Sequence, residues 1–174
     1  MAKLFLMMGK SASGKDTLYH DIVERFAGSL RTVVPYTTRP QRVGEEEGVT
    51  YLGSYLFSGC QNLTSVSLPS SLLRISDFTF HYCTGLESIT IPAGLTSIGG
   101  NPFVGCANLK RIHVDPANQY FSSVNGSLYD INHEILYAVP AAGEYQEILD
   151  GTRQVNVYAF YDCNLKVVKY TLKL

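Results

Sequence analysis

The chain has 174 residues, with 14 Lys or Arg against 15 Asp or Glu, and a formal net charge of −1. The charges are spread evenly, so the sequence offers no basic patch for nucleic acid or an anionic membrane. The apolar run at residues 4–8 is too short to span a membrane, and shorter than most signal-peptide cores. We therefore expect a cytoplasmic chain whose four cysteines are reduced thiols.

The N-terminal part has the pattern of a strand, a loop, a helix and a second strand. Residues 4–8 are continuously apolar, which is typical of a strand in a parallel sheet. Residues 9–14 form a loop of small residues, residues 15–26 have the apolar spacing of a helix, and residues 32–37 predict another strand. This order predicts an α/β fragment.

The loop after the first strand fits the phosphate-binding motif G-x-x-x-x-G-K. Glycines let several backbone N–H groups point at a phosphate, and the following helix adds the positive end of its dipole. The Ser or Thr that usually follows the lysine is replaced by Asp16, whose carboxylate could either bind Mg²⁺ or repel phosphate. The predicted site for ATP, with Asp16 as its candidate metal ligand for Mg²⁺, comprises Gly9, Ser11, Ser13, Gly14, Lys15, Asp16 and Thr17.

The next segment resembles the part of guanylate kinases that holds the phosphate of GMP. It reads Tyr-Thr-Thr-Arg-Pro-Gln-Arg-Val-Gly-Glu from position 36, and Gly48 and Tyr51 complete the pattern. The resemblance implies that Arg39, Arg42 and Tyr51 bind the GMP phosphate, as a clamp of two guanidinium groups and one phenol. The chain departs from the family at Pro35, where serine is usual.

The resemblance covers about residues 3–52 and stops before the parts that read guanine, complete the sheet and form the lid. Phosphoryl transfer requires both nucleotides to be positioned in a closed site. We therefore predict no meaningful guanylate kinase activity, and weak nucleotide binding stays open. The alternative is an ATP:GMP phosphotransferase that another chain completes.

After residue 52 the sequence becomes repetitive. The pattern F-x-x-C-x-x-L-x-x-[VI]-x-[LIV] occurs three times at an interval of 23 residues, and a degenerate fourth copy follows an insertion of 34 residues in the third repeat. One such coil cannot bury its apolar face, but coils stacked at about 4.8 Å form a continuous core. Equivalent residues would then form two structural columns, Phe57, Phe80, Phe103 and Phe160 in one, and Cys60, Cys83, Cys106 and Cys163 in the other.

Each regular coil is expected to contribute one short strand, at residues 65–68, 88–91 and 111–114. The recurring cysteines are then best explained as small buried hydrophobes, and the histidines, which lack the spacing of metal ligands, as structural or exposed residues. Alternate strand side chains should face solvent and line one surface, namely Ser65, Ser67, Ser88, Thr90, Arg111 and His113.

The repeats, with the inserted stretch that begins at Asn118, resemble the BspA-type leucine-rich repeats of bacterial and protist surface proteins. The resemblance spans about residues 54–172. It implies protein binding, often adhesion, without catalysis. It also implies a cell-surface or secreted protein, in conflict with the cytoplasmic location expected above.

The sequence thus predicts a mixed architecture, with a truncated guanylate-kinase-like α/β P-loop segment at residues 1–52 and a leucine-rich-repeat solenoid at residues 53–174. The favoured function is an interaction or adhesion module that binds an unidentified protein on its solenoid face. The kinase-like head is interpreted as vestigial or as the product of fused reading frames, with ATP and GMP as ligands only if it is functional. We also expect the sheet of the head to cap the N-terminal end of the solenoid.

Overall fold

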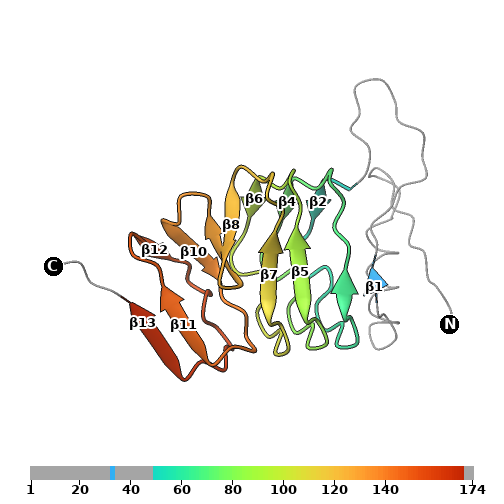
Figure 1. Cartoon of the computed structure of the whole chain (residues 1–174). Coiled ribbons are helices and arrows are strands. Elements are labelled where there is room, and N and C mark those ends of the chain that lie inside the picture. The colour runs from blue at the N-terminus through green and yellow to red at the C-terminus, as the bar shows by residue number, and fades with distance from the viewer. Residues whose placement is uncertain (1–31, 34–48, 171–174) are drawn as a thin grey trace.

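The computed structural model describes residues 32–33 and 49–170 of the chain. None of these residues lies in a helix, and their regular structure consists of short β-strands (Figure 1). The strands are β1 (Thr32–Val33), β2 (Tyr51–Leu52), β3 (Ser65–Val66), β4 (Arg74–Ile75), β5 (Ser88–Ile91), β6 (Ser97–Ile98), β7 (Arg111–Val114), β8 (Phe121–Val124), β9 (Ser127–Asp130), β10 (Ile135–Ala138), β11 (Tyr145–Ile148), β12 (Gln154–Val155) and β13 (Val167–Tyr170).

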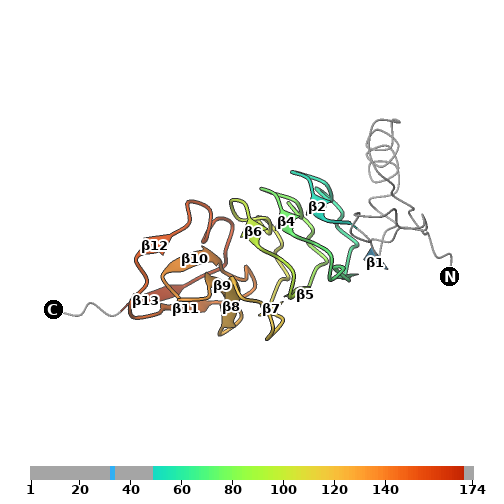
Figure 2. The same ribbon diagram turned by 90° about the horizontal axis from the view of Figure 1, so that it is seen from above.

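The strands of the regular coils form two rows of parallel strands. In one row β2, β4 and β6 pair in register, so that Leu52, Ile75 and Ile98 lie side by side. In the other row β5 pairs with β7, and β3 lies next to β5. Each coil gives one strand to each row, and the coils follow one another along a single axis (Figures 1 and 2). The solenoid of short stacked strands that the repeats predict is therefore confirmed.

The N-terminal end of the solenoid extends beyond the predicted boundary. Val49 packs against the core and Leu52 is completely buried, because they hold the repeat positions that Leu72 and Ile75 occupy 23 residues later. β1 pairs in parallel with β3, so two residues of the strand predicted at 32–37 lengthen the strand row at this end. The rest of the predicted α/β segment lies outside the described residues.

The insertion in the third repeat forms a small sheet and one further coil. β8 and β9 form an antiparallel hairpin, β10 adds to β9, and β12 joins β10 in parallel. Val139 takes the place that phenylalanine has in the regular coils, since its N–H donates to the Ala159 carbonyl at 3.0 Å, as that of Phe80 donates to the Pro102 carbonyl at 2.9 Å. The last repeat copy therefore stacks on residues of the insertion. Its strands pair with inserted strands, β12 with β10 and β13 with β11.

Candidate functional site

Most residues of the predicted nucleotide site lie outside the described residues, namely Gly9, Ser11, Ser13, Gly14, Lys15, Asp16, Thr17, Arg39 and Arg42. Tyr51, the third member of the predicted GMP clamp, lies on β2 opposite Arg74. Its hydroxyl oxygen accepts a hydrogen bond from Ser76 Oγ at 3.0 Å, and its side chain is 53% exposed. Tyr51 is thus a surface residue of a strand row, and binding of ATP, GMP or Mg²⁺ by the head stays a prediction.

The structure places the phenylalanines of the three regular copies in one column. The rings of Phe57 and Phe80 have centroids 5.2 Å apart and planes inclined by 10°, and those of Phe80 and Phe103 are 5.8 Å apart and inclined by 11°. All three side chains are buried. Phe160, in the degenerate copy, is only partly buried and belongs to a second, smaller apolar cluster.

Cys60, Cys83 and Cys106 are buried in the same core as this column, whereas Cys163 is half-buried and packs against the second cluster; all four are free thiols. The thiol of Cys83 donates to the backbone carbonyl of Phe57, and that of Cys106 to the carbonyl of Phe80, both at 3.1 Å. Burial raises the pKa of Cys60 to about 11 and that of Cys106 to about 12, so these thiols are neutral at physiological pH. Among the described residues, no group of His, Cys, Asp or Glu is arranged to hold a metal ion.

The predicted polar surface is present on the row formed by β3, β5 and β7, and we call it the strand face. The parallel register sets Ser88 opposite Arg111 and Thr90 opposite His113. Between these side chains Ile89 points into the core, so the polar groups stand on a rigid apolar support. The strand face consists of six exposed residues, Ser65, Ser67, Ser88, Thr90, Arg111 and His113.

A second surface lies on the turns that lead from one strand row to the other, and we call it the aromatic turn surface. Tyr55 stacks on Phe78 at a centroid distance of 5.2 Å, and His81 meets both rings edge-on at 5.7 Å. The ring centroids of Phe78 and Tyr158 are 5.1 Å apart. This contact reaches across the third coil, in which the residue at the same repeat position is Asn101. The aromatic turn surface comprises Tyr55, Phe78, His81, Tyr82, Tyr158 and Tyr161.

Two carboxylates lie in the same turn segments as these rings. The turn segments 53–63, 76–86, 99–109 and 156–165 contain Asp77 and Asp162 but no Lys or Arg. Hydrogen bonding and charge from Asp162 raise the pKa of Tyr82, so its phenol stays neutral. Burial lowers the pKa of His81, and Asp162 opposes this shift only in part. The aromatic turn surface therefore carries negative charge at neutral pH.

The backbone of this surface adopts a conformation that side chains rarely tolerate. Tyr55, Phe78 and Tyr82 have φ values of 59°, 55° and 53°. The position of Tyr82 is held in the neighbouring coils by Gly59 and Gly105, both with φ of 75°. A left-handed conformation costs a residue with a side chain about 1–2 kcal/mol, which glycine avoids. These aromatic residues are thus held in strained positions on the surface.

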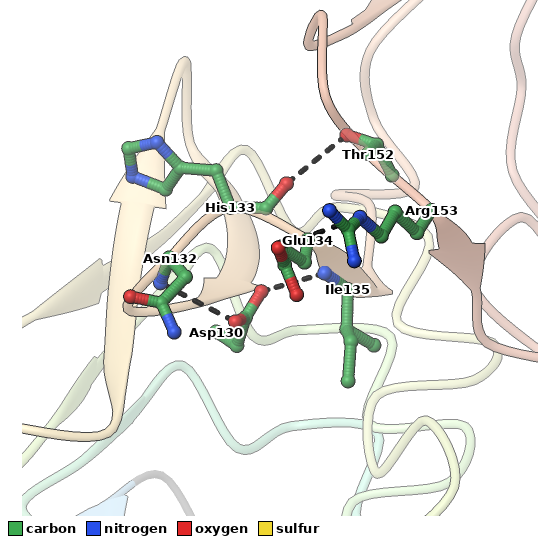
Figure 3. A network of polar contacts seen from close by, with 7 residues as sticks. All are labelled: Asp130, Asn132, His133, Glu134, Ile135, Thr152 and Arg153. Atoms are coloured by element: carbon green, nitrogen blue, oxygen red, sulfur yellow. Dashed lines mark hydrogen bonds and ion pairs between the residues drawn. The ribbon is translucent and has the colours of Figure 1, made fainter.

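A third polar cluster joins the β9–β10 turn to the segment before β12 (Figure 3). The Asp130 carboxylate accepts the N–H of Ile135 at 2.6 Å, and the hydroxyl of Thr152 donates to the carbonyl of His133 at 3.3 Å. Arg153 Nε lies 3.5 Å from Glu134 Oε1 in an exposed ion pair. These contacts close a turn and attach it to the next coil, which explains the cluster structurally.

Sequence reasoning found the strand face but missed the aromatic turn surface. The signal was available, because Tyr55, Phe78 and Tyr158 share one repeat position, and His81 and Tyr161 share another. Comparison of the repeat copies at these two positions, in addition to the apolar positions, predicts aromatic residues stacked outside the core. The tyrosine-rich composition by itself indicates only strands and turns in general.

Comparison with known proteins identifies the family. Residues 39–138 match the BspA type Leucine rich repeat region (6 copies), and the chain belongs to this family. The match begins at Arg39, inside the segment assigned to the kinase-like head. No curated protein matches the chain. No helix that could cross a membrane is found in the part of the chain that the structure describes.

Similar solved structures include a leucine rich cell surface protein from Faecalibacterium prausnitzii A2-165, which is 30% identical with a TM-score of 0.67 over 84% of this chain and 38% of that one. The pneumococcal vaccine antigen PcpA is 24% identical, with a TM-score of 0.66 over 82% of this chain and 34% of that one. A leucine-rich repeat protein from Eubacterium ventriosum ATCC 27560 is 20% identical, with a TM-score of 0.55 over 95% and 53%. The chain thus spans between about a third and a half of these proteins.

Proposed function

We propose that the chain is a protein-interaction module that contacts its partner with the strand face. The observation that carries this proposal is the parallel register of β5 and β7, which holds Ser88 beside Arg111 and Thr90 beside His113. Hydroxyl, guanidinium and imidazole groups offer both hydrogen-bond donors and acceptors to a partner. Because their strands are fixed by the core beneath, little order has to be gained on binding.

The setting of this interaction is inferred from the relatives. The F. prausnitzii protein is described as a cell surface protein, and we infer the same setting for this chain, in place of the cytoplasmic location expected from its N-terminal sequence. Adhesion to a protein on another cell or in the surrounding matrix is the function that fits such a display. Labelling of intact cells with an antibody against the solenoid would test the location, and a signal that appears only after lysis would contradict it.

Photo-crosslinking tests the strand face even while the partner is unidentified. A photoreactive phenylalanine analogue at Ser88 or Thr90 should give one discrete protein adduct, the same from both positions, in cells that produce the chain. Ser70, which is exposed on a turn outside the strand face, is the matched control position. We expect no such adduct from Ser70.

Substitution complements the crosslinking. Thr90→Arg places a bulky charge at the centre of the strand face, on a side chain that points to solvent, so folding should be unaffected. Loss of the adduct from position 88 in this background would support the proposal. Adducts of equal yield from positions 70 and 88, or an adduct that Thr90→Arg leaves intact, would refute it.

A further inference from the structure

We propose that the aromatic turn surface is a second binding site, and that it takes an arginine- or lysine-bearing segment of a protein partner. It lies on the turns between the two strand rows, apart from the strand face, so this inference stands independently of the proposed function. Cations are attracted both by aromatic ring faces and by carboxylates. The two kinds of group occur together here.

The rings form one continuous row across several turns, which suits an extended segment better than a single ion. Tyr55 contacts Phe78 at 5.2 Å, Phe78 contacts Tyr158 at 5.1 Å, and Tyr158 contacts Tyr161 at 6.0 Å. Three of the tyrosines remain well exposed, Tyr55 at 52%, Tyr82 at 46% and Tyr161 at 55%. A partner can therefore reach several rings at once.

Each carboxylate lies beside a ring of this surface. A Cβ added to Gly100 would lie 3.4 Å from Asp77 Oδ1 and 3.5 Å from Tyr158 Cδ2, so these two groups flank the same point. Asp162 directly follows Tyr161 and holds the repeat position of Tyr82, and its carboxylate raises the pKa of the Tyr82 phenol. A guanidinium or ammonium group on a ring face would thus have a carboxylate nearby, and no Lys or Arg of the turn segments 53–63, 76–86, 99–109 and 156–165 competes with it.

Closing a coil does not require an aromatic side chain at the position of Tyr82. Gly59 and Gly105 occupy the repeat position of Tyr82 in adjacent coils, so a coil closes without a side chain there. Tyr55, Phe78 and Tyr82 instead keep bulky side chains in the left-handed region, where they are strained. Strain of this kind is concentrated at binding sites, where the surrounding structure imposes it.

Neutral sugars also stack on tyrosine rings, so the charge decides between the two ligands. A sugar would gain nothing from the negative charge of Asp77 and Asp162, which lie in turn segments that contain no Lys or Arg. A basic peptide gains both the ring contacts and the ion pairs. Binding of the peptide should therefore weaken with salt, which screens exposed charges.

The experiment uses the full chain and a fluorescent peptide of alternating arginine and glycine, with binding measured by anisotropy. An alternating glutamate–glycine peptide, a serine–glycine peptide and a neutral oligosaccharide serve as competing probes. Tyr55→Asn and Tyr82→Gly introduce residues that other coils carry at the same positions, and Asp162→Asn keeps the size of its side chain. Tyr120→Ser, at a 51% exposed tyrosine outside this surface, is the matched control.

We expect saturable binding of the arginine peptide that each single variant weakens about threefold and that Tyr55→Asn with Tyr82→Gly weakens about tenfold. Tyr120→Ser should bind as the parent chain does, and the acidic and neutral probes should not compete. Thermal unfolding of each variant verifies the fold, and Asp162→Asn decides the result if Tyr82→Gly does not fold. Absence of saturable binding, equal affinity of all variants, or competition by the oligosaccharide would overturn the proposal.

Discussion

Asn118 donates a hydrogen bond from its side-chain amide to the backbone carbonyl of Pro92, at 2.8 Å, and shares the same amide with the carbonyl of Leu95 at 3.0 Å. Its Oδ1 accepts the N–H groups of Tyr120 and Phe121, both at 2.8 Å. The side chain is 3% exposed. One buried asparagine thus ties the start of the inserted hairpin to the turn of an earlier coil.

Asn118→Ala is therefore expected to destabilise the solenoid by about 3 kcal/mol, because it leaves several buried backbone groups without partners. Gln119→Ala is the matched control, since this side chain is exposed and bonds only to the nearby carbonyl of Ala117. Its effect should stay within about 0.5 kcal/mol. Denaturant unfolding followed by circular dichroism measures both. Equal midpoints for the two variants would show that Asn118 does not anchor the hairpin.

The phenylalanine column gives a second stability prediction. Phe80 is stacked on both faces, by Phe57 and by Phe103, so Phe80→Ala should lose about 3–5 kcal/mol through the cavity it leaves. Phe160→Ala removes the same atoms at a partly buried position and should cost less than half as much. Comparison of the two denaturation midpoints checks this. A larger loss from Phe160→Ala would mean that the last coil carries more of the stability than its burial indicates.

Much of the solenoid could be predicted because its apolar residues recur at a fixed interval. The strands Ser88–Ile91 and Arg111–Val114 lie at the predicted residues, since alternating burial in stacked coils leaves little freedom of register. The second strand row was not predicted. Its strands, such as Arg74–Ile75, are two residues long, too short for alternation to be seen.

Other features were hidden by competing patterns. The coil that includes Val49 and Leu52 coincides with the end of the GMP-phosphate segment, because Tyr51 fits that motif as well as the repeat. The inserted coil is hard to detect because Val139 stands where the regular coils have phenylalanine. The strain at Tyr82 depends on backbone angles that only the folded turn imposes.

We expect no phosphoryl transfer from ATP to GMP by the chain alone, because the kinase-like resemblance ends where the solenoid takes over. A coupled assay with Mg²⁺ measures this turnover, and Lys15→Ala should leave both the assay and the strand-face crosslinks unchanged. Tyr51→Phe, which removes the hydroxyl bonded to Ser76, is measured in the same assay as a variant of the predicted GMP clamp. Turnover that Lys15→Ala abolishes would instead support the nucleotide kinase completed by another chain.

The buried thiols make stability depend on pH in the alkaline range. Their pKa values are raised in the folded chain, to about 11 for Cys60 and about 12 for Cys106, whereas an unfolded thiol ionises near pH 9. Below pH 9 the thiols are neutral in both states and contribute no pH dependence. Above it the unfolded chain loses thiol protons that the folded chain retains, so the free energy of unfolding falls as the pH rises.

The decline should begin near pH 9 and continue to about pH 12, where the folded thiols ionise as well. Denaturant midpoints measured between pH 7 and 11 test it, with Cys106→Ala as the comparison. This variant starts from a lower stability because it leaves a small cavity. Its midpoint should nevertheless fall less steeply above pH 9, because one thiol fewer differs in protonation between the folded and the unfolded chain. Parallel curves for the two proteins would show that the thiol of Cys106 ionises as easily in the folded chain as in the unfolded one.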